Sequence, residues 1–387
     1  MSSTSIGKTF VVVARAASGA YFMPDGYFRA RQYPTKAGPV EVLIRTHREN
    51  LLDFDRPVPR GLFAEVRGGA ESIYQALNEF TTAAQNLTPL IALSANAPIK
   101  NMQPELAFET TEGITRREYF QQFLLPERFY PYRPRIVNGP ATRDLLLSVT
   151  ASPHSERLLR AAAQYFHALQ EWGPGQEIMA LVHLYIAVEV LTPVALREYL
   201  AQYRIEKEQL AESWGVDINQ LDSEVRRRLI FEGDGDTYLK VRKASDGFEH
   251  GFLDFHTIHA TALDLRENTA RYVRRAILKL ARVPDGTIET LSKHPYAKPF
   301  QLEYTKYLWG SLLGEGSLAR DDQLYPFVLW RSKASQKPWT DGPDPEIKFE
   351  ETFTMKLGDG ITFEPRRIEV WGARPDDDPD PPTISGA

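Results

Sequence analysis

The spacing of hydrophobic residues changes twice along this chain, and this change constrains the fold more than any other feature. In the first 150 residues, short apolar runs with turn residues nearby indicate strands at 10–13, 40–44 and 106–108. From about residue 153 the apolar residues recur at helical spacing, and after about residue 300 they alternate with polar ones. The pattern therefore predicts an α+β protein. The predicted parts are an N-terminal mixed α/β domain (1–150), a central all-α helical bundle (151–285), a small C-terminal antiparallel β domain (300–372) and a disordered acidic tail (373–387).

The N-terminal domain also contains one clear helical pattern. Apolar side chains from Ile73 to Leu87 recur at steps of three and four residues, and Ser72 stands at the expected N-cap. The segment 130–140 is rich in proline and turn residues, so it is predicted to be a linker or a long loop.

The central part reads as a succession of helices. The segment 176–191 is apolar nearly all round, which is typical of a helix at the buried centre of a bundle. Proline fits the first turn of a helix, so Pro193 is predicted to open the next one. The predicted helices begin near Pro153, at 176, at Pro193 and at Asp217, and a long final helix covers about 255–282 before Pro284.

The C-terminal part returns to the alternation of strands. Apolar and polar residues alternate over 347–357, and the glycines of GDG at 358–360 are predicted to turn the chain into a further strand. Tyr304 to Trp309 and Leu324 to Trp330 are further strand candidates.

Composition narrows the classes of function. The net charge of −5 argues against non-specific binding of duplex nucleic acid through phosphate neutralisation. The chain has no cysteine, which excludes disulfides, cysteine zinc sites and thiol nucleophiles. The longest apolar stretch, 178–191, is shorter than the about 20 residues that a membrane span needs. We therefore expect a cytoplasmic protein without a membrane segment.

The segment HGFLDFHTIH at 250–259 holds the densest cluster of side chains that could act as metal ligands or catalytic groups. It places His250, Asp254, His256 and His259 close together in the sequence. Gly251 interrupts the helix between His250 and the others, and the ligand spacing matches no standard metal site. We therefore predict a polar helix start here rather than a metal site.

Two basic segments are candidates for contact with RNA. Arginines alternate with tyrosine and phenylalanine from Arg116 and Arg117 to residue 135. Arginines hold phosphates while aromatic faces stack on unpaired bases, so this composition suits single-stranded nucleic acid. The alternative is that the aromatic residues pack against a neighbouring domain. The run Arg226, Arg227 and Arg228 is the second predicted substrate-binding segment.

Glu189 lies within the apolar segment 176–191, where an unpaired carboxylate is costly. It needs a cationic partner, and Arg242 or one of Arg226 to Arg228 is expected to supply it. A structural ion pair is predicted, and the alternative is a carboxylate that shapes an active site.

Three stretches together resemble one family. They are YFHALQEW at 165–172, the end of the apolar helix LYIAVEVL at 184–191, and VRKASDGFEHG at 241–251. In this order they resemble the HEPN superfamily over about residues 155–283. Many of its members are metal-independent endoribonucleases without a cofactor, in which an arginine and a histidine from two helices face each other across a homodimer. The resemblance implies that His250 acts as general acid or base and that Arg242 stabilises charge on the phosphate.

The spacing leaves the identity of the cation open. Seven residues separate Arg242 from His250, one more than the motif of the family, and they lie about 80° apart on a helix. Lys243, Asp246 and His250 share a face better, so Lys243 is an alternative cation and Asp246 is predicted to orient the imidazole.

Two functions follow from these features. The first is a HEPN-like endoribonuclease, of a defence or toxin type, whose flanking domains recognise a trigger or the substrate. Because many members of the superfamily lack catalysis, the second is a non-catalytic, dimerising interaction or nucleic-acid-binding protein.

Overall fold

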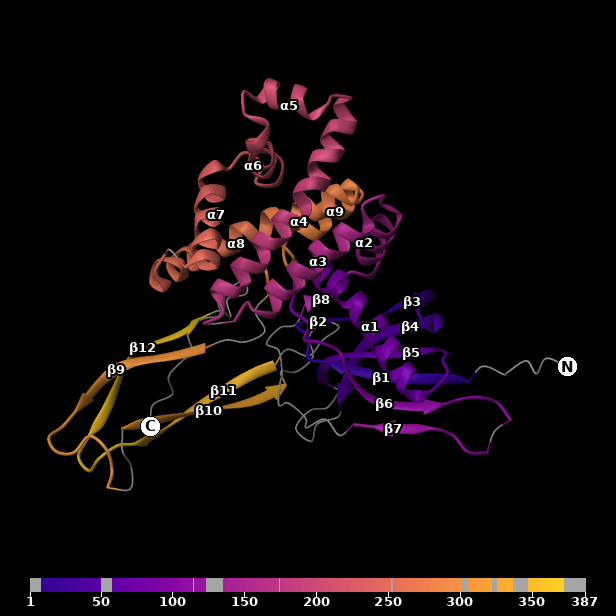
Figure 1. The fold of residues 1–387 in the computed structure, drawn as a ribbon. Coiled ribbons are helices and arrows are strands. Elements are labelled where there is room, and N and C mark those ends of the chain that lie inside the picture. The colour runs from indigo at the N-terminus through magenta and orange to yellow at the C-terminus, as the bar shows by residue number, and fades with distance from the viewer. Residues whose placement is uncertain are drawn as a thin grey trace. The chain divides into compact units, whose positions relative to one another are not determined.

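The structure, a computed structural model, describes residues 8–49, 58–113, 115–122, 135–173, 175–251, 253–300, 305–321, 326–336 and 347–371. The chain forms two compact units, which are described separately here (Figure 1). Residues 1–47 and 60–302 belong to the first unit, and residues 48–59 and 303–387 belong to the second.

A six-stranded sheet forms one layer of the first unit, with the strand order β3-β4-β5-β1-β6-β7. Strand β1 is central and pairs antiparallel with both β5 and β6. Its side chains are almost all buried, which explains the unbroken apolar run in its sequence. The strands predicted at 10–13, 40–44 and 106–108 are confirmed as β1, β4 and β6. The bounds are β1 Thr9–Ala16, β3 Tyr27–Thr35, β4 Gly38–Glu49, β5 Val58–Gly69, β6 Gln103–Glu109 and β7 Tyr119–Gln121.

Helix α1 (Ile73–Ala95) links the sheet to the other helices. Its N-cap is Ser72, as predicted, whose side chain accepts a hydrogen bond from the Gln75 N–H. The first half is amphipathic and packs on the sheet, while every residue from Leu87 to Ala95 is buried. The second half of α1 is therefore enclosed between two layers, and the sheet and the helices share one continuous core.

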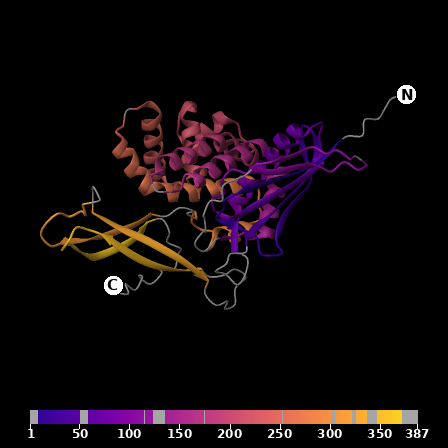
Figure 2. The ribbon, with the colours of Figure 1, turned by 90° about the horizontal axis from the view of Figure 1, so that it is seen from below.

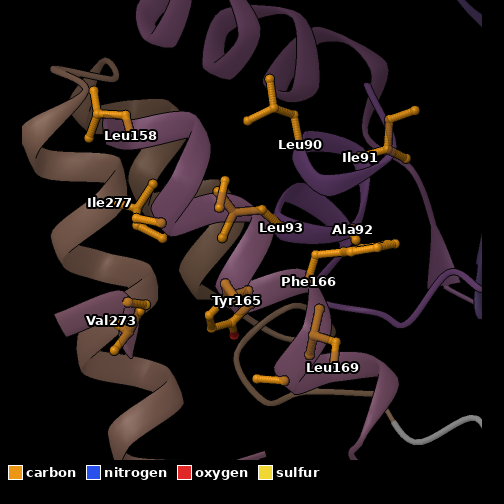
Figure 3. Packing of buried hydrophobic residues seen from close by; sticks show 14 of the residues in the cluster. Leu90, Ile91, Ala92, Leu93, Leu158, Tyr165, Phe166, Leu169, Val273 and Ile277 are labelled. Carbon is orange, nitrogen blue, oxygen red and sulfur yellow. The ribbon is translucent and has the colours of Figure 1, made fainter. Parts of the chain in front are cut away.

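Figure 3 shows where these layers meet. Leu93 of α1 lies beside Tyr165 and Phe166 of α3, and Val273 and Ile277 of α8 lie on the far side of α3. The bounds of the remaining elements of this unit are β2 Ala20–Tyr21, β8 Arg135–Ile136, α2 Gly139–Ala151, α3 Ser155–Gln170, α4 Glu177–Tyr203, α5 Lys207–Trp214, η1 Ile218–Gln220, α6 Leu221–Val225, η2 Arg226–Ile230, α7 Gly235–His250, α8 Phe255–Leu280 and α9 Asp285–Ser292.

Helix α4 lies at the centre of the bundle, as its apolar sequence predicts, and packs against α3 and α8. It is long and apolar enough to cross a membrane by length and composition, but 61% of its most apolar window is buried inside the structure. This burial fits the core helix of a soluble protein.

The prediction that Pro193 opens a new helix is wrong, because α4 continues through it to Tyr203. Proline removes one hydrogen bond from a helix interior. Buried side chains on both sides of Pro193, from Leu191 to Leu196, hold the backbone in place. Tertiary packing therefore outweighs the local preference of proline.

The segment 130–140, predicted as a linker or a long loop, is described only from residue 135 onward, and that part forms a short strand and the start of a helix. Residues 130–134 lie outside the described part of the chain. Arg135 and Ile136 form β8, which pairs parallel with β2, and Asn138 caps α2 through its side chain. The predicted domain boundary between residues 150 and 151 lies inside the first unit, in the last turn of α2, and stays a prediction.

The second unit contains two antiparallel strand pairs, which confirms its β character (Figure 2). Its strands are β9 Thr305–Leu313, β10 Phe327–Gln336, β11 Ile347–Lys356 and β12 Thr362–Trp371. Strand β10 pairs with β11, and β12 pairs with β9. The predicted tail at 373–387 lies outside the described residues.

The GDG segment turns the chain into a further strand, as predicted. The Ile361 N–H donates to the Gly358 carbonyl at 3.0 Å, and β12 begins at Thr362. The strands on its two sides, β11 and β12, pair with β10 and β9 respectively. The segment also makes a close contact with the chain that follows β9. The Gly358 N–H donates to the Leu318 carbonyl at 2.9 Å, and a Cβ on Gly358 would lie 1.8 Å from the Ser317 oxygen. Glycine is needed at position 358 for this contact between the two strand pairs.

Candidate active site at the end of helix α7

Helix α7 is held in place at its start. Asp234 is the N-cap and accepts hydrogen bonds from the N–H and hydroxyl of Thr237, at 3.0 and 2.7 Å. The Tyr272 hydroxyl of α8 donates to the same carboxylate at 3.0 Å. These hydrogen bonds lower the pKa of Asp234, so it stays charged at the positive end of the helix dipole. They fix which face of α7 is buried, namely the face with Tyr238 and Val241.

The helix runs without a break to His250. Gly247 does not interrupt it, because this glycine serves packing: a Cβ there would lie 2.5 Å from the Leu253 side chain. Gly251 ends the helix in the left-handed conformation, with φ of 68°. His250 is therefore the last helical residue, as the polar helix-end interpretation predicts.

The exposed face of α7 carries the residues that were predicted to be catalytic. Lys243 and His250 are separated by seven positions and lie about 20° apart around the helix. Both are exposed, and neither makes a hydrogen bond or ion pair with a described residue. The face thus presents an ammonium group and an imidazole to solvent.

Arg242 and Asp246 pair with each other on the flank of this face. The Arg242 Nε and Asp246 Oδ2 atoms are 3.5 Å apart, in an i, i+4 arrangement. Arg242 also approaches the Ser223 hydroxyl at 3.5 Å. Asp246 therefore lies beside Arg242 in this structure, whereas the sequence predicted that it would orient His250.

The three arginines predicted to bind substrate are engaged within the protein. Arg227 and Arg228 share Glu224, at 2.6 and 2.8 Å, and the Arg228 guanidinium lies 4.8 Å from the centre of the Trp214 ring. Hydrogen bonds from Arg227, and then from Arg228, lower the pKa of Glu224. This cluster holds η2 in position.

Glu189 has the partner that the sequence required. Its Oε1 lies 3.5 Å from Nη1 of Arg226, which also donates to the Tyr185 hydroxyl at 3.2 Å. The Glu189 side chain is 48% exposed, so the prediction of a buried carboxylate is wrong. Glu189 lies at the edge of the bundle and faces η2 rather than the core, although the residues around it in the sequence of α4 are apolar.

Arg116 and Arg117 lie on the connection between β6 and β7. Both are exposed and make no hydrogen bond or ion pair within the described part of the chain. Figure 1 shows this connection at the opposite end of the first unit from α7. Arg135, at the end of the same segment, serves the fold, since it donates to the Asn96 carbonyl at 2.8 Å.

The histidines that follow His250 face different partners. Asp254 caps α8 by accepting from the Thr257 N–H at 2.9 Å, and His256 is exposed. The Nε2 atom of His259 lies 3.3 Å from the buried Glu177 carboxylate. Among the described residues, no three histidine, aspartate or glutamate side chains are arranged to hold a metal ion.

Exposed apolar side chains also lie on α7 and at the start of α8, and sequence reasoning missed them. Leu239 and Phe248 of α7 are 57% and 41% exposed, and Phe255 of α8 is 72% exposed. The signal was present, because Phe248 and Phe255 flank the polar stretch around His250. Apolar surface gathered around a polar site is typical of an interaction face.

Comparison with models of protein families, with curated proteins and with solved structures finds no match to this chain.

Proposed function

We propose that this protein is a HEPN-like, metal-independent endoribonuclease that cleaves single-stranded RNA at the exposed end of α7. The observation that carries the proposal is the pair Lys243 and His250, which lie on one exposed face without partners among the described residues. The other predicted cations of the helical region, Arg226 to Arg228 and Arg242, pair with acidic side chains.

These two side chains suit cleavage by the RNA's own 2′-hydroxyl. The 2′-oxygen loses its proton to a base and attacks the adjacent phosphorus, and the bond from phosphorus to the 5′-oxygen breaks. An acid protonates the leaving 5′-oxygen, which gives a 2′,3′-cyclic phosphate and a 5′-hydroxyl. His250 acts as base or acid, and the Lys243 ammonium neutralises charge that develops on the phosphate.

One imidazole does not serve as base and acid at the same time, so the complete site contains two copies of α7. We accordingly propose a homodimer formed through the helical bundle, in which His250 of each chain takes one of the two roles. Arg116 and Arg117 supply a separate contact with phosphates of a longer RNA. We further propose a cytoplasmic location, as the apolar pattern of the sequence leads us to expect, and a defence or toxin role, which the resemblance alone supports.

The test is cleavage of a mixed single-stranded RNA pool by the purified full chain in EDTA. The expected products end in 2′,3′-cyclic phosphate, and RNA with 2′-O-methyl groups stays intact because it lacks the nucleophile. Lys243→Ala is expected to lower the rate at least about tenfold, since one charge-stabilising contact is lost.

Lys240→Ala is the matched control for this test, because Lys240 is an exposed lysine one turn earlier on α7. It is expected to leave the rate unchanged. Equal rates for both variants, or products with 3′-hydroxyl ends, would contradict the proposed mechanism.

A second candidate function rests on the exposed apolar side chains around α7. Leu239, Phe248 and Phe255 suit a non-catalytic dimerising protein as well as an enzyme. Phe255→Asp is expected to convert a dimer into a monomer in sedimentation velocity. If the wild-type chain dimerises through this face but cleaves no RNA, the non-catalytic function replaces the enzymatic one.

A further inference from the structure

A cavity of about 440 Å³ lies between α1 and α3, in a different part of the first unit from the α7 face. Helix α1, helix α3 and the chain that follows α1 form its walls. This volume is within the range of sites that bind small molecules. The sequence pattern gave no sign of it, because its residues come from three separate segments.

The floor of the cavity is apolar. It is lined by three buried residues: Pro89 of α1, Phe166 of α3, and Met102 in the chain between α1 and β6. Phe166 is only 1% exposed, because its side chain also packs into the core beside α1 (Figure 3). The apolar floor favours the apolar part of a ligand over a charged one.

Backbone groups fix the orientation of the polar side chains above this floor. The Ile99 carbonyl accepts from Nε2 of Gln170 at 2.9 Å, and the Met102 N–H donates to Oε1 of Gln85 at 2.6 Å. Because a carbonyl only accepts and an N–H only donates, both amides are oriented without ambiguity.

The two amides in turn fix Asn101. Nε2 of Gln85 and Nε2 of Gln170 both donate to its Oδ1, at 3.2 and 3.1 Å. The oxygen of Asn101 is therefore fully used, while its Nδ2 makes no hydrogen bond with a described residue. Asn101 is exposed and lines the cavity, so it presents an N–H donor there.

His167 provides an acceptor in the same wall. Its Nδ1 lies 3.3 Å from Oε1 of Gln170, which accepts only, so Nδ1 carries the proton of the neutral ring. Nε2 then has a free lone pair. Burial, and next the neighbouring His167, lower the pKa of His183, whose ring centre is 5.3 Å from that of His167. The His183 imidazole beside His167 therefore resists protonation.

Among the described residues that line the cavity, none is a lysine, arginine, aspartate or glutamate. A charged group brought into it would lose hydration without gaining a counter-ion. Thr81, in the same wall, has a buried hydroxyl without a hydrogen-bond partner among the described residues. The wall thus keeps hydrogen-bonding capacity for an uncharged ligand.

We propose that this cavity binds an uncharged purine nucleoside of the adenosine type. The edge of adenine offers a ring-nitrogen acceptor beside an amino donor, which matches Nδ2 of Asn101 and Nε2 of His167. The base lies over the apolar floor, and the ribose faces the open side. This site is separate from the proposed RNA cleavage and does not depend on it.

The test is isothermal titration of the full chain with adenosine. Saturable one-to-one binding is expected, and AMP is expected to bind no more tightly, because no cation in the wall meets its phosphate. Asn101→Leu is expected to weaken binding about tenfold through loss of one hydrogen bond. Asn268→Leu, at an exposed asparagine of α8, is the control and is expected to bind like the wild type.

His167→Phe keeps the ring but removes the acceptor, and it is expected to weaken adenosine binding by a similar factor. Melting temperatures show whether each variant is folded. The proposal is overturned if adenosine does not bind at millimolar concentration, if folded Asn101→Leu binds it as well as the wild type, or if AMP or glucose binds more tightly.

Discussion

Arg274 in the middle of α8 and the exposed end of α7 use similar residue types in opposite ways. Arg274 is 3% exposed and donates to four backbone carbonyls, those of Leu93, Ser94, Leu291 and Tyr296, at 2.6 to 2.9 Å. Lys243 and His250 on α7 are exposed and have no partner among the described residues. The Arg274 guanidinium therefore stabilises the fold, whereas the side chains of Lys243 and His250 remain accessible to a ligand.

The carbonyls that Arg274 binds explain its burial. Leu93 and Ser94 lie near the end of α1, where carbonyls lack partners within the helix. The guanidinium supplies the missing donors and ties α1 to α8 and to the chain after α9. Burial lowers the pKa of Arg274 to about 10, which still leaves it charged at neutral pH.

The largest effect is expected for Arg274→Met. The substitution removes the Arg274 donor from the buried carbonyls of Leu93, Ser94 and Leu291, while the Tyr296 carbonyl keeps its Asn96 donor. We therefore expect a loss of roughly 3–5 kcal/mol in the free energy of unfolding. Denaturant titration measures it. Arg275→Met is the matched control, because its neighbour Arg275 makes only a surface ion pair with Glu232, and its loss is expected to stay below about 1 kcal/mol.

A smaller loss in the free energy of unfolding is expected for Tyr165→Phe, which like Arg274→Met removes a buried donor. The buried Tyr165 hydroxyl donates to Oδ1 of Asn96 at 2.7 Å, and burial raises its pKa to about 12, so it remains a donor. Its removal leaves a buried acceptor unsatisfied, at a cost of about 1–2 kcal/mol. Tyr74→Phe, at an exposed tyrosine, should change nothing, and equal losses in the two variants would contradict this account.

The contribution of Glu224 to the free energy of unfolding is expected to depend on pH. Its carboxylate has a pKa below the ordinary value of 4.5, because Arg227 and Arg228 bond to the charged form. Its contribution is therefore present above pH 4.5 and is lost as the pH falls through the lowered pKa. We expect Glu224→Gln to cost about 0.5–1 kcal/mol at neutral pH, a modest value for a partly solvated pair. The difference from the wild type should shrink in acid, and a constant difference would be inconsistent with this role.

The smallest effects on stability are expected at the end of α7. Because Lys243 and His250 contact no described partner, Lys243→Ala and His250→Ala should each change the free energy of unfolding by less than about 0.5 kcal/mol. Thermal unfolding checks this. A loss above about 1.5 kcal/mol in either variant would mean that these side chains hold the fold together, as Arg274 does.

The sequence predicted the elements of this fold better than their connections. Periodicity located α1, α3 and α8, because each has one buried face that repeats over many residues, and the alternation of apolar and polar residues located β11. It failed at Pro193, where packing on both sides outweighs a local preference. At GDG it predicted the turn, but the partners of the strands on its two sides could not be read from the pattern.

The residue types of the candidate site were predicted, and so was an ion pair for Glu189, but the sequence did not decide which cation pairs with which carboxylate. His250 and Lys243 could be placed on one helix face from spacing alone. The pairs of Asp246 with Arg242 and of Glu189 with Arg226 depend on side-chain geometry and on how α4 meets η2. The role of Arg274 was invisible, since its four acceptors are backbone groups from distant segments that no residue pattern marks.

The most direct test of the central claim compares RNA cleavage by His250→Ala and by the wild type in EDTA, on samples with equal melting temperatures. His256→Ala, at an exposed histidine in the first turn of α8, is the matched control. Loss of general acid–base catalysis predicts that His250→Ala cleaves at least about 100-fold more slowly, while His256→Ala keeps the wild-type rate. Wild-type cleavage by folded His250→Ala, or no cleavage by the wild-type chain, would contradict the account.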